Sequence, residues 1–509
     1  MTTLPFYPAL TRRRLLQGTA ALAASFLLSD CGGSNTTVTG GNPPTGPTPT
    51  GNQPTPSGPI TSATLTVTAT AAGSIGPAFA GLSYEKSTLY EPLFTASNAD
   101  LIGLFKRLGT SLLRIGGNSV DRNIWTPSGA GQTSGQIAPS DVAACAAFVK
   151  ATGWQVLYGI NLGASATGAQ TPALAAAEVA YAYQQFGSSL LGIEIGNECD
   201  LYGNSGSYYA GNWSLAQFEA LWAQYRTAIL ATTPNVVITG PASASNESSW
   251  TVPFGQTVTK SEISLLTQHY YRANGQLATS TAAYLITPDS GLISNLKTLQ
   301  TGATGIGIPY RMSECNSYYN GGADGISDSY ASALWVIDYL FNCAQNGASG
   351  ANFHGGGDGT GYTPIADNNG VVVEARPEFY GMTLFALAGQ GTLYQTAISA
   401  GSLNVTAYTV KTPTGGLNLV IVNKDSTQNL QLTAALSQSV TTATLLEMTQ
   451  LTSGSSTPNL SATSGVTIQG ATINPDGTFS PSAAYTLSPS GTSLTCYVPA
   501  LSAVLLQLS

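Results

Sequence analysis

Residues 192–200 read GIEIGNECD, an apolar run that ends in Asn197 and Glu198 where turn residues would be expected. The run is short and rich in isoleucine, which is typical of a buried β-strand. A strand that ends by presenting an amide and a carboxyl group side by side suits a functional site better than a loop. The same kind of ending recurs along the chain, and this recurrence indicates the fold.

Between residues 78 and 390, short apolar runs alternate with longer stretches of helical periodicity, several of which begin with Asp, Ser or Pro and end with Gly. This alternation is typical of βα units around a parallel sheet. Eight such units predict a (β/α)8 TIM barrel, an α/β fold. The predicted strands are AFAGLSYE (78–85), SLLRIGGN (111–118), WQVLYGIN (154–161), GIEIGNE (192–198), VVITGPAS (236–243), SLLTQHYY (264–271), PYRMSE (309–314) and GANFHGGG (350–357).

Nearly every predicted strand is apolar through its body and polar at its C-terminal end. In a (β/α)8 barrel these ends meet on one face, where active sites of this fold are built. The sequence therefore predicts one shared site from the residues at these ends: Tyr84, Glu85, Arg114, Asn118, Asn161, Asn197, Glu198, His269, Tyr270, Tyr271, Glu314 and His354.

Helical periodicity stops after residue 390, and residues 391–509 alternate between apolar and polar positions with turn residues between the runs. This pattern predicts a C-terminal β-sandwich. The run TSATLTVTAT before the barrel predicts that residues 62–77 add a strand to the same sandwich. Residues 32–61 are rich in Pro, Gly and Thr with little apolar content, which predicts a linker.

Residues 1–31 join a basic start, Arg12-Arg13-Arg14, to an apolar run of about 15 residues, which is short for a membrane span. This predicts a signal peptide, and the arginines resemble the twin-arginine export motif. The stretch LLSDC resembles a lipobox with Cys31 as the lipid-bearing residue, although Asp30 stands where such sites usually have Gly or Ala. A lipid anchor at Cys31 and a plain export signal both stay open. We expect a bacterial-type exported protein that is periplasmic, anchored to the outer membrane or extracellular.

Only 8% of the residues are charged and the formal net charge is −8, so the chain lacks the basic stripe that nucleic acid requires. With two histidines and no CxxC pair, neither a His-rich metal centre nor a zinc site is indicated, and we expect no metal and no cofactor. Apart from Cys31, the five remaining cysteines are expected to be buried free thiols. A disulfide between Cys199 and Cys315 is the alternative.

Glu198 ends the fourth predicted strand and Glu314 the seventh, so their carboxyl groups would face each other across the barrel mouth. Glycoside hydrolysis uses such a pair, because one group protonates the leaving oxygen while the other attacks the anomeric carbon or activates water. The alternative is structural, with these carboxylates paired to Arg114 or capping loops. We expect both uses, with Arg114 beneath the site holding Glu314 ionised while Glu198 stays protonated.

Four motifs carry a family resemblance: LLRIGGNSVDRNIW (112–125), GIEIGNECD (192–200), TQHYY (267–271) and SECNSYYNGG (313–322). Through them the chain resembles glycoside hydrolase family 79, the β-glucuronidase and heparanase family of retaining (β/α)8-barrel glycosidases. The resemblance spans the barrel and extends to the C-terminal sandwich.

By this resemblance Glu198 is the acid/base and Glu314 the nucleophile. It further implies that Asn197 positions the sugar and that Tyr270 hydrogen-bonds the nucleophile. His269, one of two histidines at predicted strand ends, is expected to support the site.

The resemblance also implies how an acidic sugar is held. Family members bind the uronate carboxylate through backbone NH groups of a glycine turn after the nucleophile, helped by tyrosines. Such a nest holds an anion without Lys or Arg, which total only 17 here. Glu85 is expected to contact outer sugar hydroxyls, although heparanase-like members have Asp there. The remaining implied substrate-binding residues are Tyr319, Gly321, His354 and Tyr362.

The sequence therefore predicts a retaining, exo-acting β-glucuronidase that removes terminal β-glucuronic acid, with 4-O-methyl-glucuronic acid as a further candidate sugar. Two alternatives stay open: an endo-acting, heparanase-like glycosidase and a non-catalytic glycan-binding surface lipoprotein. The scarcity of Lys and Arg disfavours the first, because sulfated chains require basic clusters. The presence of both glutamates disfavours the second. We expect the protein to act as a monomer.

Overall fold

The computed structural model describes residues 51–359, 361–451 and 457–509. The predicted signal peptide, Cys31 and most of the predicted linker lie outside the described residues. Among the helices of the described part of the chain, none is both long enough and apolar enough to cross a membrane.

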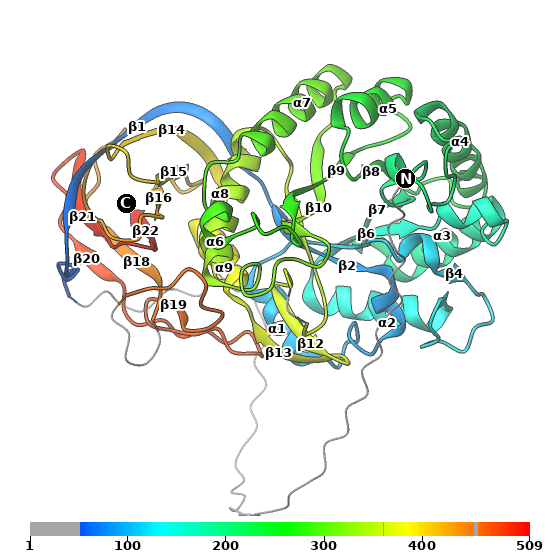
Figure 1. The fold of residues 1–509 in the computed structure, drawn as a ribbon, viewed down its shortest axis with the longest axis horizontal. Helices are drawn as coiled ribbons and strands as arrows, with labels where there is room; N and C mark the ends of the chain where they lie inside the picture. Colours follow the sequence, from blue (N-terminus) through cyan, green and yellow to red (C-terminus); the bar gives the residue numbers. More distant parts are fainter. Residues whose placement is uncertain (1–50, 360, 452–456) are drawn as a thin grey trace, which may run out of the picture. The chain divides into compact units, whose positions relative to one another are not determined.

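Eight parallel strands close into a barrel in the spatial order β10-β11-β2-β3-β6-β7-β8-β9 (Figure 1). Each corresponds to one of the eight runs that the sequence predicts, so the predicted barrel is confirmed. Strands β2, β3 and β8 are almost wholly buried because both faces of a parallel barrel are covered, whereas the C-terminal half of β9 is partly exposed. Their bounds are β2 Ala80–Glu85, β3 Leu112–Gly116, β6 Gln155–Ile160, β7 Leu190–Ile195, β8 Ile238–Ser243, β9 Leu266–Asn274, β10 Tyr310–Tyr319 and β11 Ala351–Gly355.

The helices begin and end at the residue types that favour such ends. Asn98 and Asp289 each accept a hydrogen bond from a backbone NH of the first helical turn, and Gly153 and Gly307 end their helices with positive φ. The described helices are α1 Ala99–Arg107, α2 Pro139–Thr152, α3 Pro172–Phe186, α4 Leu215–Thr232, α5 Val252–Thr257, α6 Ala282–Leu285, α7 Ser290–Ile306, α8 Tyr330–Gln345 and α9 Pro377–Ala388.

Short elements follow most barrel strands on the C-terminal side and shape the barrel mouth. They include two small two-stranded sheets, β4 with β5 and β12 with β13. The strands of these sheets are β4 Ile124–Trp125, β5 Gln136–Ile137, β12 Ile365–Asn368 and β13 Val371–Ala375. The short helices on this side are η1 Lys86–Tyr90, η2 Val120–Arg122, η3 Gly163–Thr167, η5 Cys199–Leu201 and η6 Glu247–Thr251. A further short helix, η4 Gly187–Ser189, precedes β7.

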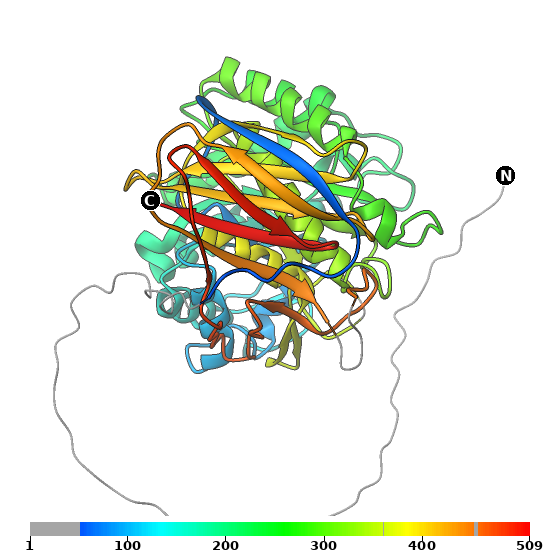
Figure 2. The ribbon, with the colours of Figure 1, turned by 90° about the vertical axis from the view of Figure 1, so that its left-hand side faces the viewer.

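The C-terminal strands form a folded, largely antiparallel sheet that encloses its own apolar core (Figure 2). Leucines of β1, β16, β17 and β22 meet in that core, so strands far apart in the sheet pack face to face as a sandwich. The strands are β1 Ile60–Ile75, β14 Gly391–Ser399, β15 Val405–Lys411, β16 Leu417–Asn423, β17 Asn429–Ala435, β18 Ala443–Gln450, β19 Val466–Ile468, β20 Tyr485–Leu487, β21 Ser493–Val498 and β22 Ser502–Leu508.

The strand predicted for residues 62–77 is β1, which begins at Ile60 and pairs with β14 on one side and β17 on the other. The described end of the predicted linker also contacts the sandwich. Asn52 forms a bridge with Thr486, and Gln53 exchanges hydrogen bonds of 2.7 and 2.8 Å with the backbone of Tyr497. These contacts occupy backbone groups near the sheet edge that would otherwise be open to another strand.

The sandwich packs against helix α8 of the barrel. The Phe341 and Tyr408 rings stack with centroids 4.3 Å apart, and the Tyr330 hydroxyl donates to the Leu501 carbonyl at 2.8 Å. Asp338 accepts hydrogen bonds from Lys424 and Tyr408. Because these groups are mostly buried, they fix the helix that lies behind β10 and its glutamate.

Candidate active site

Glu198 owes its position to the way β7 ends. The strand stops at Ile195, and Gly196 follows with φ +88°; a Cβ at this position would lie 2.4 Å from the Cys199 sulfur. Glu198 itself has φ +51°, which is rare for a residue with a side chain, and its NH donates to the Ala242 carbonyl at 2.8 Å. Such strained backbone persists where the surrounding structure demands it. The abrupt ending of GIEIGNECD is therefore a tight turn that places Glu198 at the barrel mouth.

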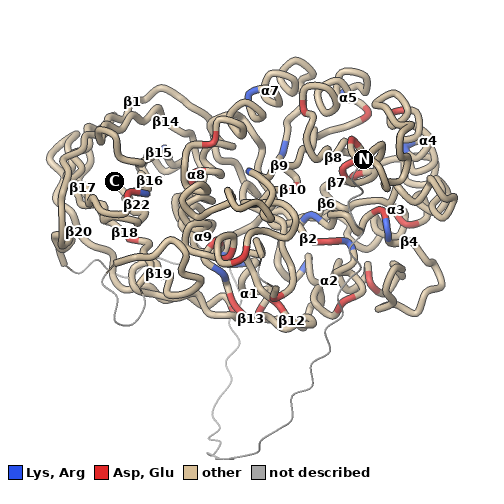
Figure 3. Tube along the Cα trace, viewed as in Figure 1, with Lys and Arg blue, Asp and Glu red and all other residues tan. Residues whose placement is uncertain are grey.

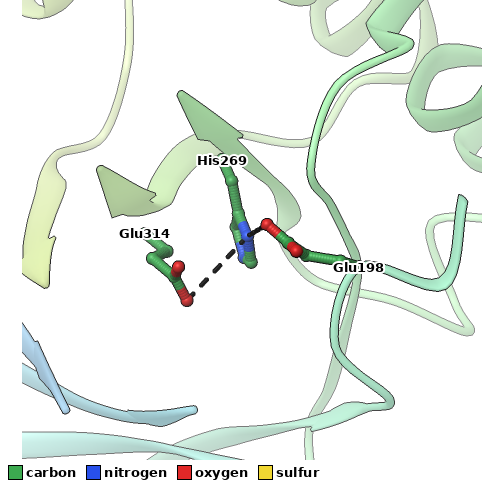
Figure 4. A group of neighbouring side chains, drawn as sticks. All are labelled: Glu198, His269 and Glu314. Atoms are coloured by element: carbon green, nitrogen blue, oxygen red, sulfur yellow. Dashed lines mark hydrogen bonds and ion pairs between the residues drawn. The ribbon is translucent and has the colours of Figure 1, made fainter. Parts of the chain in front are cut away.

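Glu314 and His269 are register partners on the neighbouring strands β10 and β9. Figure 4 shows the His269 ring between the carboxyl groups of Glu314 and Glu198. Its Nδ1 lies 3.1 Å from Glu198 Oε1 and 3.9 Å from Glu314 Oε2. One oxygen of each carboxyl group and a His269 ring nitrogen all lie within 4.8 Å of one another. The structure thus brings the two predicted glutamates together.

Arg114, from β3, lies fully buried beneath this pair. Its Nη1 donates to Glu314 Oε2 at 2.7 Å, its Nε to Glu194 Oε2 at 2.5 Å and its Nη2 to Asn197 Oδ1 at 2.9 Å. The predicted contact between Arg114 and Glu314 is present. Glu194 was missed, although a glutamate inside the apolar run GIEI signals a buried charge that needs a partner.

The pKa of Glu314 is held well below its usual range. Burial alone would raise it, but the charges of His354, His269 and Arg114 and a hydrogen bond from Tyr271 outweigh burial. The Tyr271 hydroxyl donates to Glu314 Oε1 at 2.8 Å. Glu314 is therefore an ionised carboxylate with each oxygen already bound by a donor.

Tyr271, and not Tyr270, hydrogen-bonds Glu314, so that prediction is wrong. Side chains alternate along β9, which directs His269 and Tyr271 to the barrel mouth and Tyr270 away from it. The Tyr270 hydroxyl donates instead to both carboxylate oxygens of Asp289, each at 2.9 Å. The sequence HYY places two tyrosines in adjacent positions. Which of them contacts Glu314 depends on which face of β9 points toward the mouth.

His354, at the end of β11, joins Glu314 to Glu85. Its Nδ1 lies 3.0 Å from Ser83 Oγ and 3.8 Å from Glu314 Oε2, while its Nε2 lies 3.6 Å from Glu85 Oε1. Burial works to lower the pKa of His354, but the Glu314 charge and the contact with Glu85 outweigh it and raise that pKa. His354 is thus stabilised as a cation between two carboxylates.

Glu85 is held by backbone as well as by His354. Its two oxygens accept hydrogen bonds from the NH groups of Asn118 at 3.2 Å and Ser119 at 2.7 Å. Burial would raise the pKa of Glu85, but the bonds from His354 and Ser119 lower it. The side chain remains 34% exposed, so it still faces the open mouth.

Two loops bring the remaining predicted residues to the mouth. Tyr319 ends β10 with 44% of its surface exposed, and its ring lies 6.5 Å from that of Tyr271. Tyr362 lies with its ring 5.6 Å from Tyr271 and 6.1 Å from His354. The loops touch through backbone, because a Cβ on Gly361 would lie 2.5 Å from the Gly321 carbonyl oxygen. Tyr319 and Tyr362 therefore lie at the mouth beside Tyr271, which binds Glu314, whereas the predicted residue Tyr270 does not.

Asp121 is a further residue that the sequence did not single out, although it lies in the motif LLRIGGNSVDRNIW. Its buried carboxylate accepts hydrogen bonds from the NH groups of Leu162, Gly163 and Asn197 and from the Tyr202 hydroxyl, at 2.6–3.2 Å. These donors come from the loops after β6 and β7. Asp121 therefore fixes the loop that carries Asn197 and Glu198.

Within the described residues, Glu198, His269 and Glu314 form a group whose atoms could jointly hold a metal ion. Arg114 already donates to Glu314 Oε2 at 2.7 Å, and its positive charge opposes a metal cation at this carboxylate. The arrangement suits proton transfer and nucleophilic attack better than metal binding.

The five cysteines in the described residues are free and buried, so the free-thiol expectation is confirmed. Cys315 Sγ donates to the Asn352 carbonyl at 3.4 Å, and Cys199 Sγ contacts the Ile195 carbonyl at 3.8 Å. Burial raises the pKa of both thiols well above the ordinary value. The alternative of a bridge between them is wrong.

A closed parallel barrel with two carboxyl groups at its C-terminal mouth is the architecture of the (β/α)8-barrel glycosidases. No protein-family model matches the chain. A β-glucuronidase from Aspergillus niger is 25% identical over 348 residues, which cover 61% of this chain and 62% of that protein. The chain thus aligns with less than two thirds of this relative. The match confirms the resemblance to β-glucuronidases that the motifs indicate.

Solved structures share the fold over most of the chain. A 4-O-α-L-rhamnosyl-β-D-glucuronidase from Fusarium oxysporum has a TM-score of 0.70 at 20% identity, covering 87% of this chain and all of that one. A GH51 arabinofuranosidase from Xanthomonas axonopodis pv. citri has a TM-score of 0.62 at 14% identity, covering 88% of this chain and all of that one. At these identities the likeness establishes the barrel and its accompanying sheet domain.

The contact between Glu314 and His354 is open to a direct test. Glu314→Gln removes the carboxylate that contributes most to raising the pKa of His354, so this pKa should fall. NMR titration of the imidazole protons measures it, because the chain has only two histidines and His269→Asn assigns the signals. An unchanged or higher pKa of His354 in Glu314→Gln would contradict the described geometry.

Proposed function

We propose that this protein is a retaining, exo-acting β-glucuronidase that removes terminal β-glucuronic acid from glycans or glycoconjugates. One observation carries the proposal: the ionised Glu314, held by Arg114 and Tyr271, faces Glu198 across the barrel mouth. The β-glucuronidase relative supports the choice of sugar.

The two glutamates take different roles in the proposed reaction. In the first step Glu198 gives its proton to the glycosidic oxygen while Glu314 attacks the anomeric carbon, which releases the aglycone and leaves a glycosyl ester on Glu314. In the second step Glu198 takes a proton from water, whose oxygen attacks the anomeric carbon and frees Glu314. Water is consumed and both carboxyl groups return to their starting states.

The close approach of the carboxyl groups supports retention. Retaining enzymes keep them about 5–5.5 Å apart, whereas inverting enzymes need about 6.5–9.5 Å to admit a water molecule. Here an oxygen of Glu198 lies within 4.8 Å of an oxygen of Glu314. We therefore propose that Glu314 attacks the sugar directly, as in retaining enzymes.

Asn197 is oriented to bind the sugar. Its side-chain oxygen Oδ1 accepts a hydrogen bond from Arg114 at 2.9 Å, and its side-chain nitrogen Nδ2 has no hydrogen-bond partner among the described residues. The NH2 group can therefore donate to the sugar 2-hydroxyl, a contact that strengthens as the oxocarbenium ion forms. The hydrogen bond from the buried Arg114 guanidinium fixes this orientation of the Asn197 side chain.

Backbone NH groups beside Glu314 suit the sugar carboxylate. Asn320, Gly321 and Gly322 follow β10 with φ of 62°, 83° and 92°, a tight turn that only such residues adopt readily. The NH groups of Gly321, Gly322 and Tyr362 donate to no other residue that the structure describes. Together with the Tyr319 and Tyr362 hydroxyls, they form an anion site that needs no basic side chain.

The distribution of charge favours an exo-acting enzyme over a heparanase-like one. Basic residues are few along the chain, and Figure 3 shows no continuous band of them across the described residues. A densely sulfated polysaccharide would require such a band. The Fusarium enzyme is named for glucuronate that carries a 4-O-rhamnosyl group, so we include 4-O-substituted glucuronate, such as the 4-O-methyl form, in the proposal.

We propose, from the predicted signal peptide, that the enzyme is exported and acts on glycans outside the cytoplasm. A lipid anchor at Cys31 would hold the enzyme at a membrane surface. We propose that it works there as a monomer, because every residue in the site comes from one barrel.

The proposed activity is tested by comparing an aryl β-glucuronide with the matching aryl β-glucoside as substrates of the full chain. We expect a strong preference for the glucuronide, measured as kcat/KM from release of the aryl group. Glu314→Gln should lose activity by several orders of magnitude and keep its fold, since the nucleophile is lost while its shape remains.

Preference for the glucoside would overturn the choice of an acidic sugar and leave the two glutamates in their roles. Equal activity of Glu314→Gln and the wild type would overturn the catalytic assignment itself. Circular dichroism of both proteins checks that the comparison concerns folded enzyme.

Tyr271 and Tyr270 offer a matched pair of variants. Tyr271→Phe removes one hydrogen bond to the ionised Glu314, and kcat should fall about tenfold to hundredfold, as expected for a bond to a charged group. Tyr270→Phe removes the same hydroxyl from the neighbouring position, where it donates to Asp289 outside the mouth, and kcat should change little. Steady-state kinetics on the glucuronide would contradict this assignment if Tyr270→Phe were the slower enzyme.

A further inference from the structure

The loop that carries Tyr362 to the mouth is pinned at both ends. At its start the NH groups of Gly356 and Gly357 donate to Thr363 Oγ1 and Asp367 Oδ1, each at 2.8 Å. At its end Asn316 Nδ2, two residues beyond the nucleophile, donates to the Tyr362 carbonyl at 2.6 Å. Between these ends, the carbonyls of Asp358, Gly359 and Gly361 are bound by one further residue.

That residue is Arg376, which precedes α9 and is only 7% exposed. Its Nη1 donates to the carbonyls of Gly359 at 2.8 Å and Gly361 at 3.2 Å, and its Nη2 to the carbonyl of Asp358 at 3.1 Å. The acidic group paired with it is Glu374, 3.5 Å from Nε, whose side chain is 51% exposed. The buried guanidinium is therefore directed mainly at loop carbonyls.

The nearby acidic side chains are engaged elsewhere. The Asp358 carboxylate accepts from Asn368 Nδ2 at 2.7 Å, and Asp367 accepts from the Gly357 NH. Neither carboxylate is hydrogen-bonded to Arg376 in the described residues. The Nη1 and Nη2 groups of Arg376 therefore donate to the backbone carbonyls of the loop and not to these carboxylates.

Arg376 also determines where the loop NH groups point. In a trans peptide the carbonyl and the following NH point in opposite directions. Because the Gly361 carbonyl faces Arg376, the Tyr362 NH faces away from it. That NH borders the glycine turn after Glu314, since a Cβ on Gly322 would lie 3.0 Å from the Tyr362 nitrogen. The cation on the far side also polarises these peptides and strengthens their NH groups as donors.

We propose that Arg376 is a positioning residue for recognition of the acidic sugar. It holds Tyr362 and its backbone NH against the Gly321–Gly322 turn, so that the sugar carboxylate meets aligned donors. Arg376 does not touch the carboxylate, and its charge reaches the anion through the peptide groups. This inference rests on the proposed glucuronidase function and adds a determinant of its specificity that lies outside the mouth.

The test replaces Arg376 with Lys and with Met and measures kcat and KM on the aryl β-glucuronide. A single ammonium cannot reproduce the planar fork that reaches three carbonyls, so both variants should be affected, Met more than Lys. For Arg376→Met we expect KM to rise about tenfold or more while kcat changes less than about threefold, because the carboxylate is bound in substrate and transition state alike.

Arg311 supplies the matched control. It is also buried and donates to the carbonyls of Phe79, Ser349 and Ala351, but at the start of β10, at the opposite end of the barrel from the mouth. Arg311→Lys and Arg311→Met therefore lose comparable hydrogen bonds and should keep the wild-type KM. Thermal unfolding of all variants identifies any that fail to fold. If Arg376→Met fails to fold, the KM of Arg376→Lys is used for the comparison instead.

An unchanged KM in folded Arg376 variants, or the same rise in KM for the Arg311 variants, would overturn the role of Arg376. A wild-type protein that hydrolyses no β-glucuronide would overturn the proposed function and this role with it. A wild-type enzyme that is active with unchanged KM in the variants would overturn the role of Arg376 alone, so the two failures are distinguishable.

Discussion

The site depends on one buried guanidinium, that of Arg114. It binds Glu314, Glu194 and Asn197 at once, and none of these contacts exceeds 2.9 Å. A buried charge is costly unless it is paired, and here two carboxylates and an amide oxygen pair it. Together with the charges of His354 and His269, the contact with Arg114 keeps Glu314 ionised, and the Arg114 contact with Asn197 leaves the Asn197 NH2 group free to donate. Three strands of the barrel thereby become a single polar arrangement with fixed geometry.

Around Arg114, the conformation of the backbone also determines the shape of the site. Gly196 and the positive φ of Glu198 end β7 at the mouth, and the lack of side chains at Gly322 and Gly361 lets two loops meet through their backbones. The backbone NH groups of Gly321, Gly322 and Tyr362 donate to no other described residue, which leaves them available to an anion. An acidic sugar can then be held by a protein with few basic residues, because oriented peptide dipoles supply the positive potential. Arg376 adds charge behind those dipoles without entering the mouth.

The sequence predicted the barrel well because each buried strand forms a continuous apolar run and each strand end is polar. It also predicted Glu198, Glu314 and Arg114, whose types and positions carry the chemistry. It failed at Tyr270 because the choice between adjacent tyrosines depends on which face of β9 points inward, and β9 and β10 shift register between Met312 and Glu314. Arg376 was missed because its partners are backbone carbonyls of a loop, which leave no mark in the sequence.

The proposed mechanism requires that Glu314 attack the anomeric carbon directly, with no water molecule between Glu314 and this carbon. The anomeric configuration of the first sugar released from an aryl β-glucuronide tests this claim most directly. Proton NMR recorded in the first minutes of hydrolysis, before mutarotation, resolves the two anomers. We expect β-glucuronic acid as the initial product. Initial release of α-glucuronic acid would show inversion and would contradict the account.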